Sequence, residues 1–124
     1  MVRSKVAQTV ESLGDYLKEQ RLGAKLSLRQ LADQAGVSNP YLSQIERGLR
    51  RPSAEVLQQI AKALRISAEQ LYVRAGILDP TDGEARSVEL AVLADPALTE
   101  RQKQSLLDVY APFLAVNAGR DDRA

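Results

Sequence analysis

The sequence contains neither cysteine nor histidine among its 124 residues. Without cysteine, disulfide bonds and thiolate metal sites are excluded, and the composition fits a reducing compartment. Without histidine, the chain also lacks the most common general base and the usual ligands of zinc and iron. An enzyme would therefore have to work with carboxylates alone. We predict no enzymatic activity, no metal site and no cofactor.

Aromatic residues and long apolar runs are scarce as well. Aromatic residues make up 4% of the chain and hydrophobic residues 44%, so we expect an aliphatic, alanine-rich core, which favours helices. No apolar run approaches the roughly 20 residues that span a bilayer. The polar start "MVRSKVAQTVESLGD" lacks the apolar core of a signal peptide. We therefore expect a cytoplasmic protein.

Charge is distributed unevenly along the chain, although the net charge is only +1. Up to Leu78 there are twelve Lys and Arg against seven Asp and Glu, whereas from Asp79 onward there are five against nine. Only the first part is basic, so we expect only this part to meet a polyanion.

The spacing of apolar residues predicts five helices between residues 5 and 75. The first runs from about residue 5 to residue 22 and ends at Gly23. The other four each begin after a serine that can act as an N-cap: Ser27, Ser38, Ser53 and Ser67. Two of these serines precede a glutamine by three residues, the capping-box pattern: Ser27 with Gln30 and Ser67 with Gln70.

A turn-rich stretch, "GILDPTDGEA", separates this region from the rest. We therefore predict two parts, residues 1–78 and an acidic extension, residues 79–124. The extension contains a short helix in "SVELAVLADP" and a last helix that starts at another capping box, Thr99 with Gln102. We expect Pro112 to kink or break that helix, and the tail "NAGRDDRA" to be disordered. The predicted fold is all-α, with five helices followed by one or two more.

The second and third helices form a specific pattern. A short helix, a Gly36-Val37 turn and a helix capped by Ser38 make the helix-turn-helix layout, in which the second helix enters the DNA major groove. Helix pairs joined at glycine are also common in all-α proteins that bind no DNA, so the layout alone leaves both interpretations open.

Residues 26–67, "LSLRQLADQAGVSNPYLSQIERGLRRPSAEVLQQIAKALRIS", resemble the Cro/CI (XRE) family of helix-turn-helix regulators. The segments "LA", "AGVS", "LSQIERG" and "AKAL" stand at the family's spacing. The resemblance implies a five-helix domain that binds double-stranded DNA, usually as a homodimer on an operator. It also implies a transcriptional regulator, more often a repressor.

The same resemblance places residues of the third helix against DNA bases. These residues are Asn39, Pro40, Tyr41, Ser43 and Gln44. Gln44 is the strongest candidate, because its amide offers a donor and an acceptor to the adenine N6/N7 edge. The alternative for this face is simple solvation.

Three arginines that follow the third helix can reach the flanking phosphates: Arg47, Arg50 and Arg51. One of them could instead serve only the helix dipole. The start of the second helix offers further phosphate contacts, at Ser27, Leu28 and Arg29. The family tends to have glutamine where this chain has Leu28, so backbone amides must act there. The resemblance also implies a structural ion pair between Arg21 and Glu46.

Apolar residues of the last helix gather on one side and require a partner surface. They are Leu106, Leu107, Tyr110, Phe113 and Leu114. We predict that they form a homodimer, which would let two domains engage two half-sites. Two alternatives remain open: the residues pack onto the first and fifth helices of their own chain, or they bind a different protein, as in an antitoxin-like regulator. No residue pattern indicates a small-molecule site.

Overall fold

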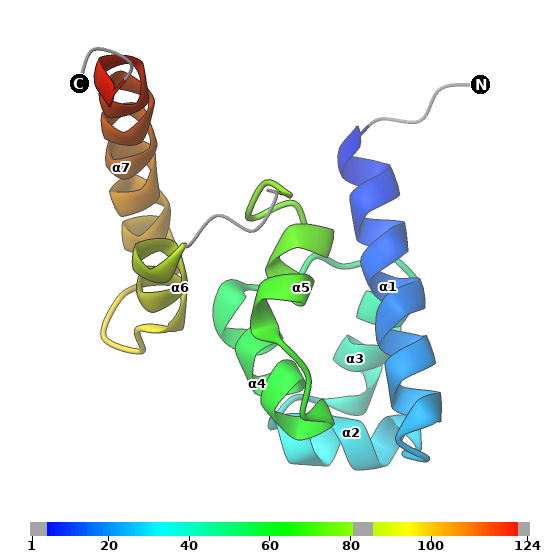
Figure 1. Cartoon of the computed structure of the whole chain (residues 1–124). Helices are drawn as coiled ribbons and strands as arrows, with labels where there is room; N and C mark the ends of the chain where they lie inside the picture. Colours follow the sequence, from blue (N-terminus) through cyan, green and yellow to red (C-terminus); the bar gives the residue numbers. More distant parts are fainter. Residues whose placement is uncertain (1–4, 81–85, 122–124) are drawn as a thin grey trace. The chain divides into compact units, whose positions relative to one another are not determined.

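Every regular element in the described part of the chain is a helix. The computed structural model describes residues 5–80 and 86–121, with side chains from 13 to 80 and from 86 to 119. The chain forms two compact units, Met1–Glu84 and Ala85–Ala124. The first contains helices α1 to α5 and the second α6 and α7 (Figure 1). The described residues thus have the predicted all-α architecture, with two helices after the first five.

The helices of the first unit begin and end close to the predicted positions. Their bounds are α1 Lys5–Gly23, α2 Leu28–Ala35, α3 Asn39–Glu46, α4 Ala54–Leu64 and α5 Ala68–Arg74. Serine side chains cap three of them by accepting a hydrogen bond from the backbone amide three residues later. The three distances are 3.0 Å at Ser27, 3.2 Å at Ser38 and 3.1 Å at Ser53.

The capping box predicted at Ser67 is wrong. The Ser67 side chain makes no capping hydrogen bond to α5. Its ψ is 126°, whereas the three serines that do cap have ψ between 152° and 165°. A capping hydroxyl must point back over the first turn of the helix, so the backbone angle at the cap decides whether the bond can form.

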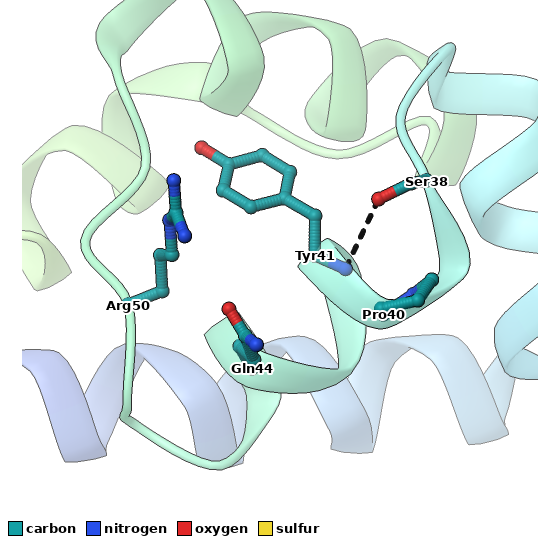
Figure 2. A pocket seen from close by; sticks show the side chains of 5 residues that line it. All are labelled: Ser38, Pro40, Tyr41, Gln44 and Arg50. Atoms are coloured by element: carbon teal, nitrogen blue, oxygen red, sulfur yellow. Dashed lines mark hydrogen bonds between the residues drawn. The ribbon is translucent and has the colours of Figure 1, made fainter.

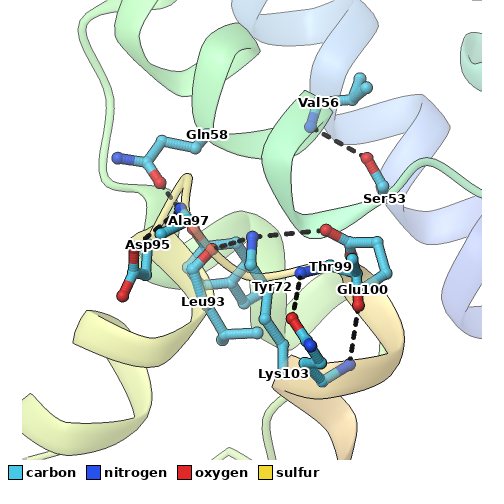
Figure 3. Close-up of polar contacts among 11 residues, drawn as sticks. Ser53, Val56, Gln58, Tyr72, Leu93, Asp95, Ala97, Thr99, Glu100 and Lys103 are labelled. Atoms are coloured by element: carbon cyan, nitrogen blue, oxygen red, sulfur yellow. Dashed lines mark hydrogen bonds and ion pairs between the residues drawn. The ribbon is translucent and has the colours of Figure 1, made fainter.

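The core of the first unit is aliphatic, as expected from the composition. Its fully buried large side chains are Leu13, Leu17, Leu31, Leu42, Leu57, Leu71, Ile45, Ile60 and Tyr72. Full burial of such a side chain stabilises the fold by about 1.5 to 3 kcal/mol. The polar end of Tyr72 has a partner, because its hydroxyl lies 3.4 Å from Oε1 of Gln58 (Figure 3). Through this core α2 packs on α3 and α4, and α1 packs on α3 and α5.

Gly14 lets α1 and α3 cross closely. A Cβ at this position would lie 2.8 Å from the carbonyl oxygen of Ile45 and still closer to that of Glu46. Both obstacles are backbone atoms at the end of α3, and they cannot rotate away. Only glycine fits this crossing, which brings the end of α3 directly against the middle of α1.

The second unit is a helical hairpin of α6 (Ser87–Ala94) and α7 (Glu100–Asp121). The connection ends in the predicted Thr99–Gln102 capping box, with bonds of 3.0 and 3.2 Å. Lys103 joins the two helices, because its ammonium group donates to the carbonyl oxygen of Leu93 at 2.8 Å and lies 3.3 Å from the Glu100 carboxylate (Figure 3). The Lys103 side chain is buried, as is that of Leu93.

The last helix differs from two expectations, a break at Pro112 and a disordered tail. Pro112 lies inside α7, which continues beyond it without ending. A proline removes one amide donor and crowds the preceding turn, but the surrounding turns keep their own hydrogen bonds. The helix also extends to Asp121, so residues 117–121 of the tail are helical rather than disordered. The last three residues, 122–124, lie outside the described residues.

None of the helices described is both long enough and apolar enough to cross a membrane.

Candidate nucleic-acid interface

The turn between α2 and α3 sets the direction of α3. Gly36 has a left-handed backbone with φ of 73°, and the following amide, of Val37, donates to the Ala32 carbonyl oxygen at 3.0 Å. Ser38 then caps α3 by accepting from the Tyr41 amide. The chain therefore leaves one helix and enters the next within three residues. This is the helix-turn-helix layout.

Helix α3 has an inner and an outer side. Leu42 and Ile45 on its inner side are fully buried, where α3 packs on α1 and α2. The other side carries the residues predicted to face DNA bases, of which Pro40 is exposed and the remainder are half-buried: Asn39, Pro40, Tyr41, Ser43 and Gln44. The inner pair fixes the helix, and the outer set remains accessible.

An open hollow of about 440 Å³ lies over the outer side of α3 (Figure 2). We call it the α3 hollow, and its lining residues are Ser38, Pro40, Tyr41, Gln44 and Arg50. Arg50 belongs to the loop after α3, yet its guanidinium carbon lies 5.1 Å from the centroid of the Tyr41 ring. A cation over an aromatic face at this distance is attracted to the ring. The hollow therefore combines an amide, a phenol and a guanidinium.

Asn39 differs from the other members of the predicted set. Its side-chain oxygen is buried and has no hydrogen-bond partner within the described part of the chain. Asn39 also does not line the α3 hollow, whereas Pro40, Tyr41 and Gln44 do. The structure thus brings three of the five predicted residues together around one opening and turns part of Asn39 away from it.

The expected ion pair between Arg21 and Glu46 is present. Nε of Arg21 lies 2.7 Å from Oε2 of Glu46, and Nη2 lies 3.0 Å from Oε1, so the contact is bidentate. A third guanidinium nitrogen donates to the Leu26 carbonyl oxygen at 3.1 Å. The hydrogen bond from Glu46 raises the pKa of Arg21 above its ordinary value, although partial burial acts in the opposite direction. This pair holds the end of α3 against α1.

The three arginines after α3 have different surroundings. All three are exposed, but Arg51 donates from Nη2 to the carbonyl oxygen of Ala75 at 3.0 Å, at the end of α5. Arg50 lies over Tyr41, as described above. The sequence gives no basis for distinguishing them, because the contacts come from residues that lie far away along the chain.

The start of α2 has the arrangement expected of an anion site on a helix. Ser27 and Gln30 form the reciprocal capping box, with bonds of 3.0 and 2.7 Å. The first amides of a helix, here those of Leu28 and Arg29, have no intrahelical partner. Leu28 is half-buried and Arg29 is exposed, so the Arg29 side chain is the more accessible of the two.

The apolar residues predicted on the last helix are largely uncovered. Leu106, Phe113 and Leu114 are exposed, and Leu107 and Tyr110 are half-buried. Val109 and Val116 extend the same surface, and the two residues are 56% and 60% exposed.

Two contacts between helices of the first unit were not predicted from the sequence. Gly14 is one of them, since a glycine inside a predicted helix gives no sign of its neighbour. The Tyr16 ring also lies 3.9 Å from the guanidinium carbon of Arg74, which joins α1 to α5. Within the described residues, no group of three or more acidic side chains is placed to hold a metal ion.

Comparison with known proteins gives consistent matches. A helix-turn-helix family model matches residues 17–71. An uncharacterised HTH-type transcriptional regulator of Mycobacterium tuberculosis is 62% identical over 104 residues, which cover 84% of this chain and 73% of the relative. The HTH-type transcriptional repressor RghR of Bacillus subtilis is 33% identical over 128 residues, which cover 88% of this chain and 95% of that one.

A solved structure matches about half of the chain. The clp gene regulator ClgR of Corynebacterium glutamicum aligns with a TM-score of 0.50 and 35% identity, covering 55% of this chain and 72% of its own. The relatives are transcriptional regulators and not enzymes. The chain therefore belongs to the Cro/CI (XRE) family of helix-turn-helix proteins and is a transcriptional regulator with a DNA-binding domain.

Proposed function

We propose that this regulator is a repressor that binds an inverted-repeat operator as a homodimer. The outer side of α3 would enter the major groove, with Gln44 reading a base edge and Pro40, Tyr41 and Ser43 beside it. Arg47, the remaining donors of Arg51, and the start of α2 at Ser27, Leu28 and Arg29 would hold the flanking phosphates. Asn39 would contribute less, because its side-chain oxygen is buried.

The exposed apolar surface of α7 carries the homodimer. Four exposed residues recur at spacings of three, four and three, which we call the α7 stripe: Leu106, Val109, Phe113 and Val116. This alternation is the a/d pattern by which two helices pack in a coiled coil. Leu107, Tyr110 and Leu114 border the stripe and would widen the contact. The α6 helix, with 8 residues against 22 in α7, is too short to cover it.

A two-fold dimer leads to a specific kind of operator. Residues that pair across a two-fold axis place two identical reading helices in opposite orientations. The half-sites should then form an inverted repeat with centres about one helical turn, roughly 34 Å, apart. The repressor role is supported by RghR, the relative that carries this description in its name.

The decisive experiment changes the α7 stripe in the full chain. The double variant L106E/F113E places two charges on the stripe, and A115E places one charge on the opposite side of the same helix. We expect the parent and A115E to sediment as dimers without DNA, and L106E/F113E to sediment as a monomer. The monomer should bind a single half-site as the parent does. It should lose the higher affinity that the parent shows for the inverted repeat over a single half-site.

A parent chain that sediments as a monomer at micromolar concentration would contradict the homodimer. The apolar surface of α7 would then either pack onto helices of its own chain or bind a different protein, the two alternatives to a homodimer. A double variant that still dimerises would contradict the stripe as the contact.

A further inference from the structure

We propose that Arg50 reads a guanine base beside the base pair read by Gln44, and that the Tyr41 ring holds it in position to do so. This inference rests on the proposed docking of α3 in the major groove. It assigns Arg50 to the bases, whereas its position in the sequence, after the recognition helix, suggests a phosphate contact.

The first observation is the place of Arg50. Although it belongs to the loop between α3 and α4, it lines the α3 hollow together with Tyr41 and Gln44. In Figure 2 the Arg50 side chain comes from the loop, and its guanidinium lies beside the Tyr41 ring; Gln44 lines the same hollow. A base edge that meets the Gln44 amide would therefore have the guanidinium close by.

The second observation is the contact with Tyr41. The guanidinium carbon lies 5.1 Å from the ring centroid. A free arginine on a surface samples many rotamers, whereas a guanidinium over an aromatic ring loses much of this freedom. A phosphate contact tolerates such freedom, because a phosphate can be approached from many directions. A bidentate contact to a base edge requires a fixed planar fork.

The loop that carries Arg50 is itself held at both ends. Gly48 has a left-handed backbone with φ of 74°, and the Leu49 amide donates to the Gln44 carbonyl oxygen at 2.8 Å. On the other side, Arg51 donates to the Ala75 carbonyl oxygen, and Pro52 is buried. The backbone of Arg50 is therefore placed by its neighbours, and its side chain is placed by Tyr41.

The chemistry selects the base. The guanidinium fork matches the two acceptors of guanine, O6 and N7, in the major groove, whereas adenine offers one acceptor and one donor there. The Gln44 amide suits the adenine edge. We therefore expect each half-site to contain a guanine within a base pair or two of the position that Gln44 reads.

The test compares base preferences of full-length variants by selecting bound duplexes from a random pool and sequencing them. R50A removes the guanidinium altogether: a phosphate role predicts weaker binding to all sequences alike, whereas a guanine-reading role predicts loss of the guanine preference at one position. We expect R50A to lose about ten-fold or more of the preference for guanine at one position of each half-site, while the other positions keep theirs. Y41L, which removes the aromatic ring, should weaken the guanine preference. R47A should lower binding to all sequences alike.

The outcomes separate this inference from the proposed function. A parent that enriches a motif which R50A leaves unchanged at every position would overturn the role of Arg50 alone. A guanine preference that Y41L leaves at its full strength would overturn the role of the ring. A parent that enriches no sequence at all would overturn the proposed operator binding, and the reading of guanine with it.

Discussion

Single residues decide how firmly α3 is held against the rest of the first unit. Gly14 allows the end of α3 to lie against α1, and the bidentate pair of Arg21 with Glu46 ties the same two helices together. The ion pair followed from the family resemblance, because both residues stand at the family's positions. The role of Gly14 could not be predicted, since it depends on a carbonyl oxygen that is more than thirty residues away in the sequence.

Replacing Gly14 by alanine should destabilise the first unit. The new methyl group would meet backbone oxygens of Ile45 and Glu46 that cannot move without displacing α3. We expect a loss of about 1 to 3 kcal/mol in the free energy of unfolding, measured by urea titration. Gly23 is the matched control, because a Cβ there meets nothing within 4 Å. Alanine has the higher helix propensity, so G23A should keep or gain stability, and an equal gain for G14A would contradict the close crossing.

Whole helices were predicted more reliably than the contacts between them. The apolar spacing and the serine caps gave α1 to α5 with bounds close to those observed, because both signals are local. Ser67 is the exception, since its pattern is right but its backbone angle does not allow the bond. The separate surroundings of Arg50 and Arg51 could not be predicted either, because Tyr41 and Ala75 come near them only in the folded chain.

Two serine variants test the caps as elements of stability. S38A removes the hydroxyl that accepts from the Tyr41 amide, which should cost about 1 kcal/mol in the free energy of unfolding. S67A removes a hydroxyl that makes no capping bond, so its cost should be close to zero. Thermal or urea unfolding of the two full-length variants measures the difference. Equal costs would mean that the Ser38 cap adds nothing to the stability of α3.

At the scale of the whole molecule, positive charge and exposed apolar surface belong to different units. The basic residues gather before residue 79, whereas the exposed apolar side chains of the α7 stripe lie in the second unit, Ala85–Ala124. The uneven distribution of charge along the sequence already indicated two parts with different surfaces. That α6 leaves this surface exposed required the structure, because apolar spacing on a helix looks the same whether or not the neighbouring helix covers it.

Salt dependence should show how many phosphate contacts the dimer makes. Each contact contributes about 0.9 to the slope of log K against log salt, so R47A in a dimer should flatten the slope by about two units. R101A removes the same charge from the second unit and should leave the slope unchanged. Titrations of the inverted repeat at several salt concentrations measure both slopes. If R47A shows the same slope as the parent, Arg47 does not contact a phosphate.

The small interior of the second unit has a consequence for how the regulator responds to its own abundance. Within the described residues of this hairpin, only Arg86, Leu93 and Lys103 are buried. So few buried side chains leave a hairpin of two helices marginally stable, and association through the α7 stripe would supply the missing burial. Operator occupancy would then rise with the square of the monomer concentration while monomers predominate. Repression would set in over a narrow range of protein level, as a threshold rather than a gradual dose response.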